Sequence, residues 1–332
     1  MTRRSAALVL QLACLPLAQA GSPSSSDSSA ALQQAGTVRT PLGQCEIWLP
    51  ADYSATDAEF LAGAVADLSL VLSDRLGPVH PQPFQLVITA DRAQFDEWTG
   101  RRLPEWIQAL ALESPSRLVI SNYPGPLGDA GRQEVEQVLL HELTHAYLHR
   151  ARWPAGRTPL PAWFHEGLAV EMSGGLSRDL QRAVLWARWT GRLQRLRDLR
   201  TIRHQTAAAS QIAYAQSALA LQYLTYRHGE SARTDLLAAL GKFSSFERAY
   251  PQTFGEPLIS FEAGYLTWLR QRYNLLLLAS DPATLFMLLP ALMIVAYLAT
   301  SLRTRRRKAQ WAAAEQLQAD DSAPPKPDDP AP

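Results

Sequence analysis

Cysteine is almost absent from this sequence, which has only Cys14 and Cys45 among 332 residues. Small secreted domains that depend on disulfides carry many more, so a disulfide-stapled scaffold is excluded. We expect Cys14 to be lost with an N-terminal segment, which would leave Cys45 alone in the mature chain. The folded part must therefore be stabilised by a hydrophobic core, for which a hydrophobic content of 47% is sufficient.

A surplus of charge of either sign is also missing, because 32 basic and 31 acidic residues give a formal net charge of +1. The composition therefore gives no electrostatic reason to expect a nucleic acid partner. The one dense basic run, Arg303 to Lys308, directly follows an apolar segment. This order is typical of a membrane boundary.

Two apolar segments predict where the protein is located. Arg3 and Arg4, an apolar run and then Ala18-Gln19-Ala20 predict a signal peptide over residues 1–20, cleaved after Ala20. Residues 282–302 contain no charge and are long enough to cross a bilayer as a helix. With the basic run on the cytoplasmic side, we expect a single-pass membrane protein whose folded domain lies outside the cytoplasm.

The remaining segments differ sharply in composition. Residues 21–37 are expected to form a Ser-rich flexible linker, and residues 303–332 a basic and then Pro/Asp-rich cytoplasmic tail. Between them, residues 38–273 read as one domain. Its first part mixes a helix with strand-like runs, and helices follow from Gly131 on; the expected segments are helix 57–77 and strands 45–50, 84–89 and 117–121. This order predicts an α+β fold with a small mixed or antiparallel sheet.

Two histidines and a glutamate interrupt the apolar pattern of "VLLHELTHAYLH", residues 138–149. If residues 132–150 are helical, His141 and His145 project within about 40° of each other, so both imidazoles can reach one metal ion. Glu142 lies beside them, where a carboxylate can reach a metal-bound water. This is the H-E-x-x-H pattern of zinc hydrolases. His149 continues the row and is expected to be a solvated neighbour; the alternative for the whole pattern is a helix with incidental histidines.

A catalytic zinc ion needs a third protein ligand, and "LPAWFHEGLAVEM" offers Glu166. Pro161 suits a helix start, which places Glu166 in an apolar helix where an unpaired carboxylate is costly. A zinc ion would remove that cost. An ion pair with one of the many arginines is the alternative explanation for Glu166, and Glu171 is the next candidate ligand.

"HELTH", followed after twenty residues by Glu166 of "WFHEGLA", resembles the gluzincin branch of zincin metallopeptidases, specifically the bacterial peptidase MA-like domain. Trp163, Glu166, Gly167 and Ala169 match the W-x-x-E-G-x-A pattern of related aminopeptidases. The spacing is two residues longer than theirs, Glu171 replaces a common Tyr, and no G-x-M-E-N segment is present. Aminopeptidase specificity is therefore not implied.

The resemblance implies a zincin-like fold in which a small mixed sheet precedes the active-site helix and a helical C-terminal subdomain. It implies Zn²⁺ held by His141, His145 and Glu166, with Glu142 as general base and a peptide or protein as substrate. Tyr214 is the first candidate for donating a hydrogen bond to the oxyanion, and His204 is the second.

The same resemblance implies that "RLVIS", residues 117–121, borders the substrate cleft. It also suggests a bacterial inner membrane with the domain facing the periplasm. One alternative is a catalytically silent zinc domain that binds an envelope component, and another is no metal at all. The presence of Glu142 favours catalysis, because a structural zinc site does not require a general base.

Overall fold

The computed structural model describes residues 12–15, 31–113, 116–121, 129–151, 160–199, 206–243, 245–273 and 282–321. Contacts divide the chain into two units, Met1–Arg272 and Tyr273–Pro332. The sheet and helices α1 to α9 belong to the first unit, and helix α11 belongs to the second.

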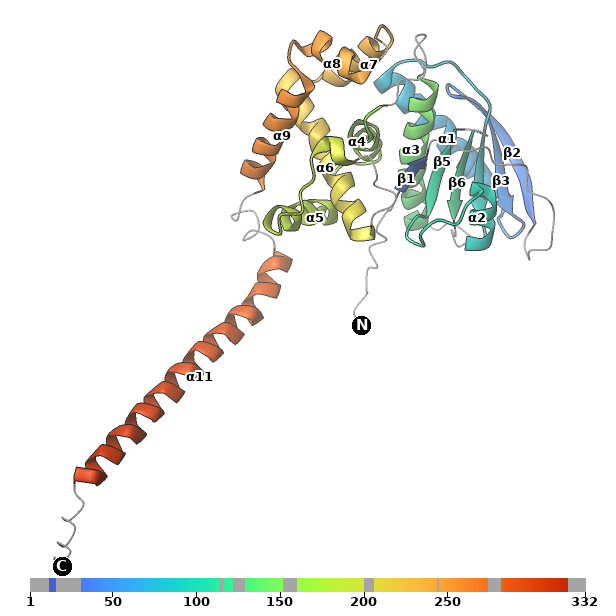
Figure 1. The fold of residues 1–332 in the computed structure, drawn as a ribbon. Coiled ribbons are helices and arrows are strands. Elements are labelled where there is room, and N and C mark those ends of the chain that lie inside the picture. The colour runs from blue at the N-terminus through green and yellow to red at the C-terminus, as the bar shows by residue number, and fades with distance from the viewer. Residues whose placement is uncertain are drawn as a thin grey trace, which may run out of the picture. The chain divides into compact units, whose positions relative to one another are not determined.

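Within the described residues, six strands form one mixed sheet in the order β1-β5-β6-β4-β3-β2 (Figure 1). The strands are β1 Leu12–Leu15, β2 Leu32–Thr40, β3 Gly43–Pro50, β4 Phe84–Thr89, β5 Ala109–Leu112 and β6 Arg117–Ser121. The pairs β1/β5, β3/β4 and β4/β6 are parallel, whereas β2/β3 and β5/β6 are antiparallel. The predicted mixed sheet and its three expected strands are present.

Three strands were not expected from the sequence. β2 begins at Leu32, so residues 32–37 of the expected linker form a strand on the sheet edge. β1 lies within the expected signal peptide, whose cleavage stays a prediction. β5 reads "ALAL", which lacks β-branched residues, and all four residues are buried. Tertiary packing outweighs the weak strand propensity of this segment.

The alternation of side chains in β5 lets a helix approach one face of the sheet. Leu110 and Leu112 join a buried cluster with Phe95 of helix α2, Arg92–Thr99. Ala109 and Ala111 consequently point to the opposite face, since successive strand residues alternate. Helix α3, Asp129–Arg150, contacts β5. The methyl groups of these two alanines leave room for the side chains that α3 turns toward the sheet.

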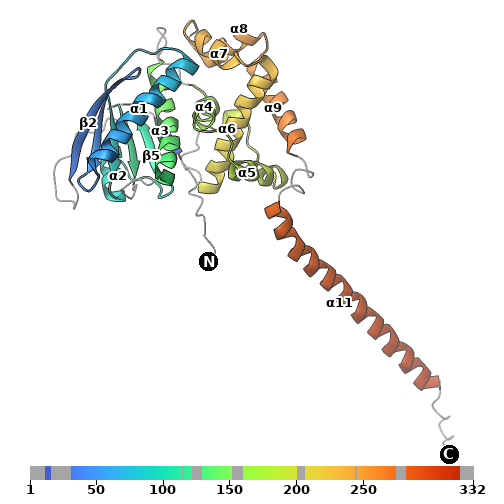
Figure 2. The same cartoon turned by 180° about the vertical axis from the view of Figure 1, so that it is seen from behind.

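Helix α1, Ala55–Leu76, matches the expected helix closely. It starts at a capping box in which the Ser54 hydroxyl accepts from the Asp57 amide, while an Asp57 carboxylate oxygen accepts from the Ser54 amide. It ends at Gly77, whose φ of 96° is costly for other residues. α1 packs on α3, and in Figures 1 and 2 α1 and α2 lie on opposite faces of the sheet.

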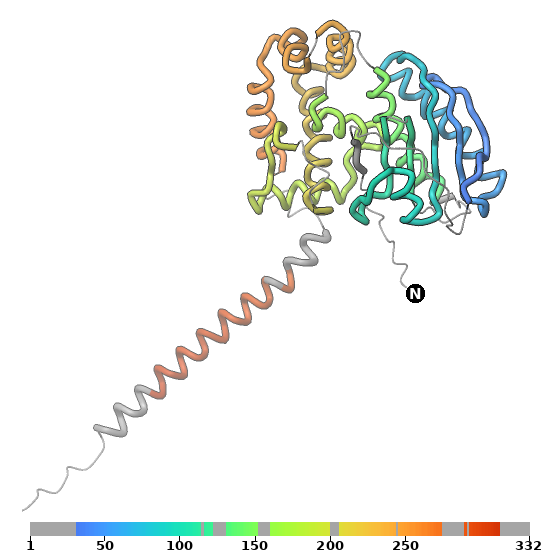
Figure 3. The backbone as a smooth tube through the Cα atoms, turned by 45° about the vertical axis from the view of Figure 1, so that its right-hand side comes forward, coloured from blue at the N-terminus to red at the C-terminus, as the bar shows by residue number. Residues whose placement is uncertain are grey.

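The helices after α3 gather on the side of α3 away from most of the sheet (Figure 3). They are α4 Ala162–Met172, α5 Arg178–Trp189, α6 Ala207–His228, α7 Ala232–Leu240, α8 Phe246–Phe254 and α9 Leu258–Arg272. α6 contacts α4, α5, α7 and α9 and is largely buried, so it is the centre of this helical part. Its many alanines and serines permit close helix packing.

The second unit contains α11, Pro282–Asp321, which includes the apolar run and continues through the basic residues that follow it. No helix in the described part of the chain is both long and apolar enough to cross a membrane. This finding contradicts the predicted single-pass membrane location with a span at residues 282–302.

A buried arginine fixes the C-terminal end of α3 against the sheet. Arg150 is 4% exposed, and its guanidinium lies over the Phe84 ring, 4.8 Å from the centroid. It donates to the Leu42 carbonyl at 3.0 Å and to the Ser116 hydroxyl at 2.8 Å. Burial lowers the pKa of Arg150 to about 10, so the side chain stays charged at neutral pH. The helix that carries the two histidines is thereby tied to the loops at one end of the sheet.

We predict that Arg150→Met lowers the free energy of unfolding by about 3 kcal/mol, because each carbonyl left unpaired in the interior costs roughly 1–3 kcal/mol. Urea denaturation of the variant and the unaltered protein measures the difference. Arg102→Met is the control, since Arg102 is exposed and surface substitutions usually change stability by less than about 0.5 kcal/mol. Equal losses in both variants would contradict an anchoring role.

Candidate metal centre

The H-E-x-x-H residues and Glu166 meet at the contact between α3 and α4. His141 and His145 are 1% and 0% exposed on α3, and Glu166 is 6% exposed on α4. Glu166 Oε2 lies 3.7 Å from His141 Nε2 and 3.5 Å from His145 Nε2. One ligand atom from each residue lies within 4.8 Å of the other two. The structure thus brings together the three ligands expected from the sequence.

The polar atoms of this cluster lack hydrogen-bond partners. Within the described residues, several buried atoms of the cluster form no hydrogen bond. They are both ring nitrogens of His141, both ring nitrogens of His145 and the Oε2 atom of Glu166. Buried polar atoms are almost always satisfied, because leaving them unpaired is costly. A divalent cation held by two imidazoles and one carboxylate would satisfy the inward-facing atoms, and this donor set suits zinc. The residues present therefore fit the ion.

The electrostatics of the cluster also suit a cation. Burial lowers the pKa of His141 to about 4, so its imidazole is neutral at pH 7, as a metal ligand must be. Burial alone would raise the pKa of Glu166, but the facing imidazoles of His145 and His141 lower it below its ordinary value. The centre therefore combines a neutral imidazole with an ionised carboxylate.

Glu166 reaches the histidines because α4 lies unusually close to α6. A Cβ atom added to Gly167 would meet the Ser217 carbonyl oxygen at 2.5 Å, so only glycine permits this approach. One turn earlier on the same face of α4, the Trp163 ring stacks on Phe261 with centroids 5.6 Å apart. Glu166 is consequently fixed by its immediate neighbour along the chain.

Glu142 lies in the same buried region, on the side that faces the sheet. It is 0% exposed, and neither carboxylate oxygen has a hydrogen-bond partner among the described residues. Burial raises the pKa of Glu142 well above its ordinary value, the charge of Glu166 raises it further, and the Ala111 backbone partly offsets both. A carboxyl group with a raised pKa can accept a proton and later release it.

The contact of Glu142 with Ala111 identifies the strand beside the centre as β5. β6, which contains "RLVIS", lies between β4 and β5 and is paired on both sides. A strand paired on both sides cannot bind a further extended peptide through its backbone. The expectation that residues 117–121 border the cleft as the substrate-pairing strand is therefore wrong, and β5 occupies the place next to α3.

Tyr214 of α6 lies near the candidate metal ligands. It is 3% exposed, and its ring is 6.4 Å from the His141 ring in a perpendicular orientation. The second candidate, His204, is outside the described residues. Glu171, the alternative ligand, forms an ion pair with Arg233 of α7 instead of facing the histidines.

His165, which was not predicted from the sequence, stacks on the candidate ligand His145 with ring centroids 4.5 Å apart and an interplanar angle of 12°. The His149 ring lies 5.5 Å from the His165 ring, and His149 is half-buried rather than fully solvated. His165 precedes Glu166, and no sequence pattern marks it. Only the packing of α4 on α3 shows that its ring constrains His145.

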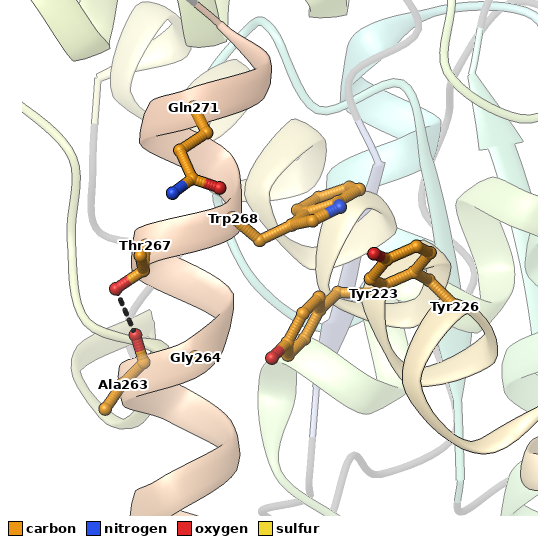
Figure 4. Close-up of a pocket in the computed structure, with 7 residues that line it drawn as sticks. All are labelled: Tyr223, Tyr226, Ala263, Gly264, Thr267, Trp268 and Gln271. Atoms are coloured by element: carbon orange, nitrogen blue, oxygen red, sulfur yellow. Dashed lines mark hydrogen bonds between the residues drawn. The ribbon is translucent and has the colours of Figure 1, made fainter.

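A pocket of about 430 Å³ lies elsewhere, between α6 and α9 (Figure 4). Tyr223, Tyr226 and Trp268 line it, and the Tyr223 hydroxyl fits where Gly264 has no side chain. No histidine or carboxylate contributes to its lining. This pocket therefore has no metal-binding chemistry.

No family model matches this chain, and no curated protein matches it. An M1 zinc metallopeptidase from Deinococcus radiodurans is similar in structure over 72% of this chain and 51% of its own, with 18% identity and a TM-score of 0.38. Legionella pneumophila aminopeptidase A, in complex with aspartic acid, is similar over 73% of this chain and 28% of its own, with 15% identity and a TM-score of 0.41. This chain therefore spans about half of the first structure and less of the second. These similarities are distant, and the metal centre is assigned from its own residues.

We predict that Glu166→Ala removes most of the zinc from the purified protein, because two histidines on one helix form an incomplete site. Metal analysis after dialysis against a weak chelator measures the zinc content. Glu171→Ala is the matched control, since Glu171 lies one turn further along α4 and pairs with Arg233. Full zinc occupancy in Glu166→Ala would show that Glu166 is not a ligand.

The close packing of Gly167 against α6 can be tested in the same way. Gly167→Ala should force α4 away from α6, lower the free energy of unfolding by about 1–3 kcal/mol and weaken zinc binding. Gly63→Ala in α1 is the control, because an added Cβ there meets nothing within 4 Å and alanine favours a helix. Thermal unfolding and zinc titration on both variants test the difference. Unchanged zinc affinity in Gly167→Ala would contradict the dependence of Glu166 on this contact.

Proposed function

We propose that the chain is a zinc-dependent peptide hydrolase. The observation that supports it most is the meeting of His141, His145 and Glu166 ligand atoms within 4.8 Å, beside the buried carboxylate of Glu142. A structural zinc site is closed by four protein ligands, whereas three ligands leave a position for water. The choice of peptides as substrates rests on the resemblance of "HELTH" and "WFHEGLA" to metallopeptidases.

When bound, zinc would polarise a substrate carbonyl and lower the pKa of a coordinated water. Glu142 accepts the proton of the attacking water, since no hydrogen bond within the described residues occupies its carboxylate oxygens. Its raised pKa favours holding that proton until it passes to the departing amine. Water is largely excluded around the buried Glu142, which strengthens these interactions.

Tyr214 is proposed to donate its hydroxyl proton in a hydrogen bond to the oxyanion. Its ring approaches His141 from α6, so the hydroxyl belongs to the same buried region as the metal ligands. A donor already in place stabilises developing negative charge without further reorganisation.

We predict that Glu142→Gln keeps the fold and the zinc but loses most peptide cleavage, because an amide of nearly equal size cannot accept the proton. General bases contribute about 10²- to 10⁴-fold in rate. Cleavage of a broad peptide library and zinc content are measured on the same preparations.

Glu136→Gln is the matched control for this test, since Glu136 is exposed on the same helix. This variant should cleave peptides normally. Equal cleavage by Glu142→Gln and the unaltered protein contradicts the mechanism. If the unaltered protein binds zinc but cleaves no peptide, the site is a catalytically silent zinc domain.

A further inference from the structure

Positive charge is concentrated on α5 and the loop that follows it. Residues 178–199 contain six arginines and two aspartates, a net charge of +4, although the whole chain carries only +1. The arginines are Arg178, Arg182, Arg188, Arg192, Arg195 and Arg197. We call this the α5 arginine surface. The rest of the chain is net acidic, so the concentration is local.

Much of this charge is not neutralised within the protein. Arg178, Arg192 and Arg195 are exposed, and no carboxylate of the described residues lies within ion-pairing distance of them. Arg197 lies 3.8 Å from Glu262, but its side chain remains 50% exposed. Clustered, uncompensated arginines create a positive potential that attracts an anionic partner.

Two tryptophans are exposed on the same helix. Trp186 and Trp189 are 48% and 42% exposed, whereas Val184 and Leu185 point into the core. The Arg188 guanidinium lies 5.6 Å from the centroid of the Trp189 ring. Tryptophan and arginine are enriched where proteins bind other proteins, and tryptophan is rarely left in water without such a role.

The α5 arginine surface is held next to the helix that carries Tyr214. The Gln194 amide donates to the Gln216 side chain at 3.0 Å, and the Gln216 amide group donates back to the Gln194 carbonyl at 2.8 Å. Gln216 is fully buried and follows Tyr214 by two residues. Figures 1 and 2 show α5 beside the first half of α6. α5 also contacts α6 itself, so the surface lies against the helix that carries Tyr214.

We propose that the α5 arginine surface binds acidic segments of the polypeptides that the metal centre cleaves. This inference rests on the proposed peptidase function. Carboxylates pair well with the planar guanidinium groups, and the exposed tryptophans supply apolar contact for the chain between them. An acidic polypeptide is favoured over a nucleic acid because the proposed function already gives the protein a polypeptide substrate.

Binding is tested first without cleavage, on the Glu142→Gln protein. Fluorescence anisotropy compares a labelled oligoglutamate peptide with oligoglutamine of the same length. We expect oligoglutamate to bind, and binding to weaken as salt screens the charges. Arg192→Glu combined with Arg195→Glu should raise its Kd at least about tenfold. Arg101→Glu combined with Arg102→Glu, in the loop after α2, should leave the Kd unchanged.

Cleavage is then measured with a peptide that carries or lacks an acidic tail. The tail should lower KM at unchanged kcat, and the α5 double variant should lose that advantage while cleaving the untailed peptide normally. Equal KM values for both peptides in the unaltered protein overturn the proposal, as does oligoglutamate binding that the α5 variant retains. Duplex DNA bound through the same arginines, with oligoglutamate unbound, would reassign the surface to nucleic acid. Absence of any cleavage defeats the peptidase function, while the anisotropy experiment still decides whether the surface binds acidic peptide.

Discussion

Burial of two imidazoles and a carboxylate without hydrogen-bond partners is the constraint on which the rest of the structure depends. His141, His145 and Glu166 are nearly inaccessible to water, and their facing atoms lie too far apart for strong hydrogen bonds. Such an arrangement is costly unless something completes it. A cation between the three residues would offset the cost, which is why the centre is best understood as a metal site.

Small residues allow this cluster to form. Gly167 brings α4 against α6, and Ala111 leaves room on β5 for Glu142. Arg150 holds the end of α3 on the other side, through contacts with segments more than thirty residues away. The positions of the ligands are therefore set by packing at three places outside the cluster itself. Rigid elements of this kind hold a reactive geometry more accurately than loops do.

The same burial gives two neighbouring carboxyl groups different properties. Glu166 faces imidazoles, which lower its pKa and keep it ionised. Glu142 faces the sheet, where burial and the charge of Glu166 raise its pKa. One carboxylate is thereby suited to hold a cation and the other to exchange a proton. Pairs of carboxyl groups whose environments move their pKa values apart are typical of sites that perform acid–base chemistry.

Patterns that depend on local spacing were predicted well. The four-residue interval between His141 and His145, the capped helix α1 and the start of α4 after Pro161 all appear as expected. They could be predicted because helix periodicity and capping are properties of adjacent residues. The predicted membrane span at residues 282–302 is contradicted, because no helix in the described part of the chain is long and apolar enough to cross a membrane.

By itself, the sequence determined which residue types are available as ligands and base, and that strands precede helices. Only the tertiary structure decided that β5 rather than β6 lies beside α3, that His165 stacks on His145, and that Glu171 turns to Arg233 instead of the histidines. These choices depend on contacts between helices and strands far apart in the chain. No spacing of neighbouring residues encodes them, because they follow from how closely a glycine, an alanine or an arginine lets two elements pack.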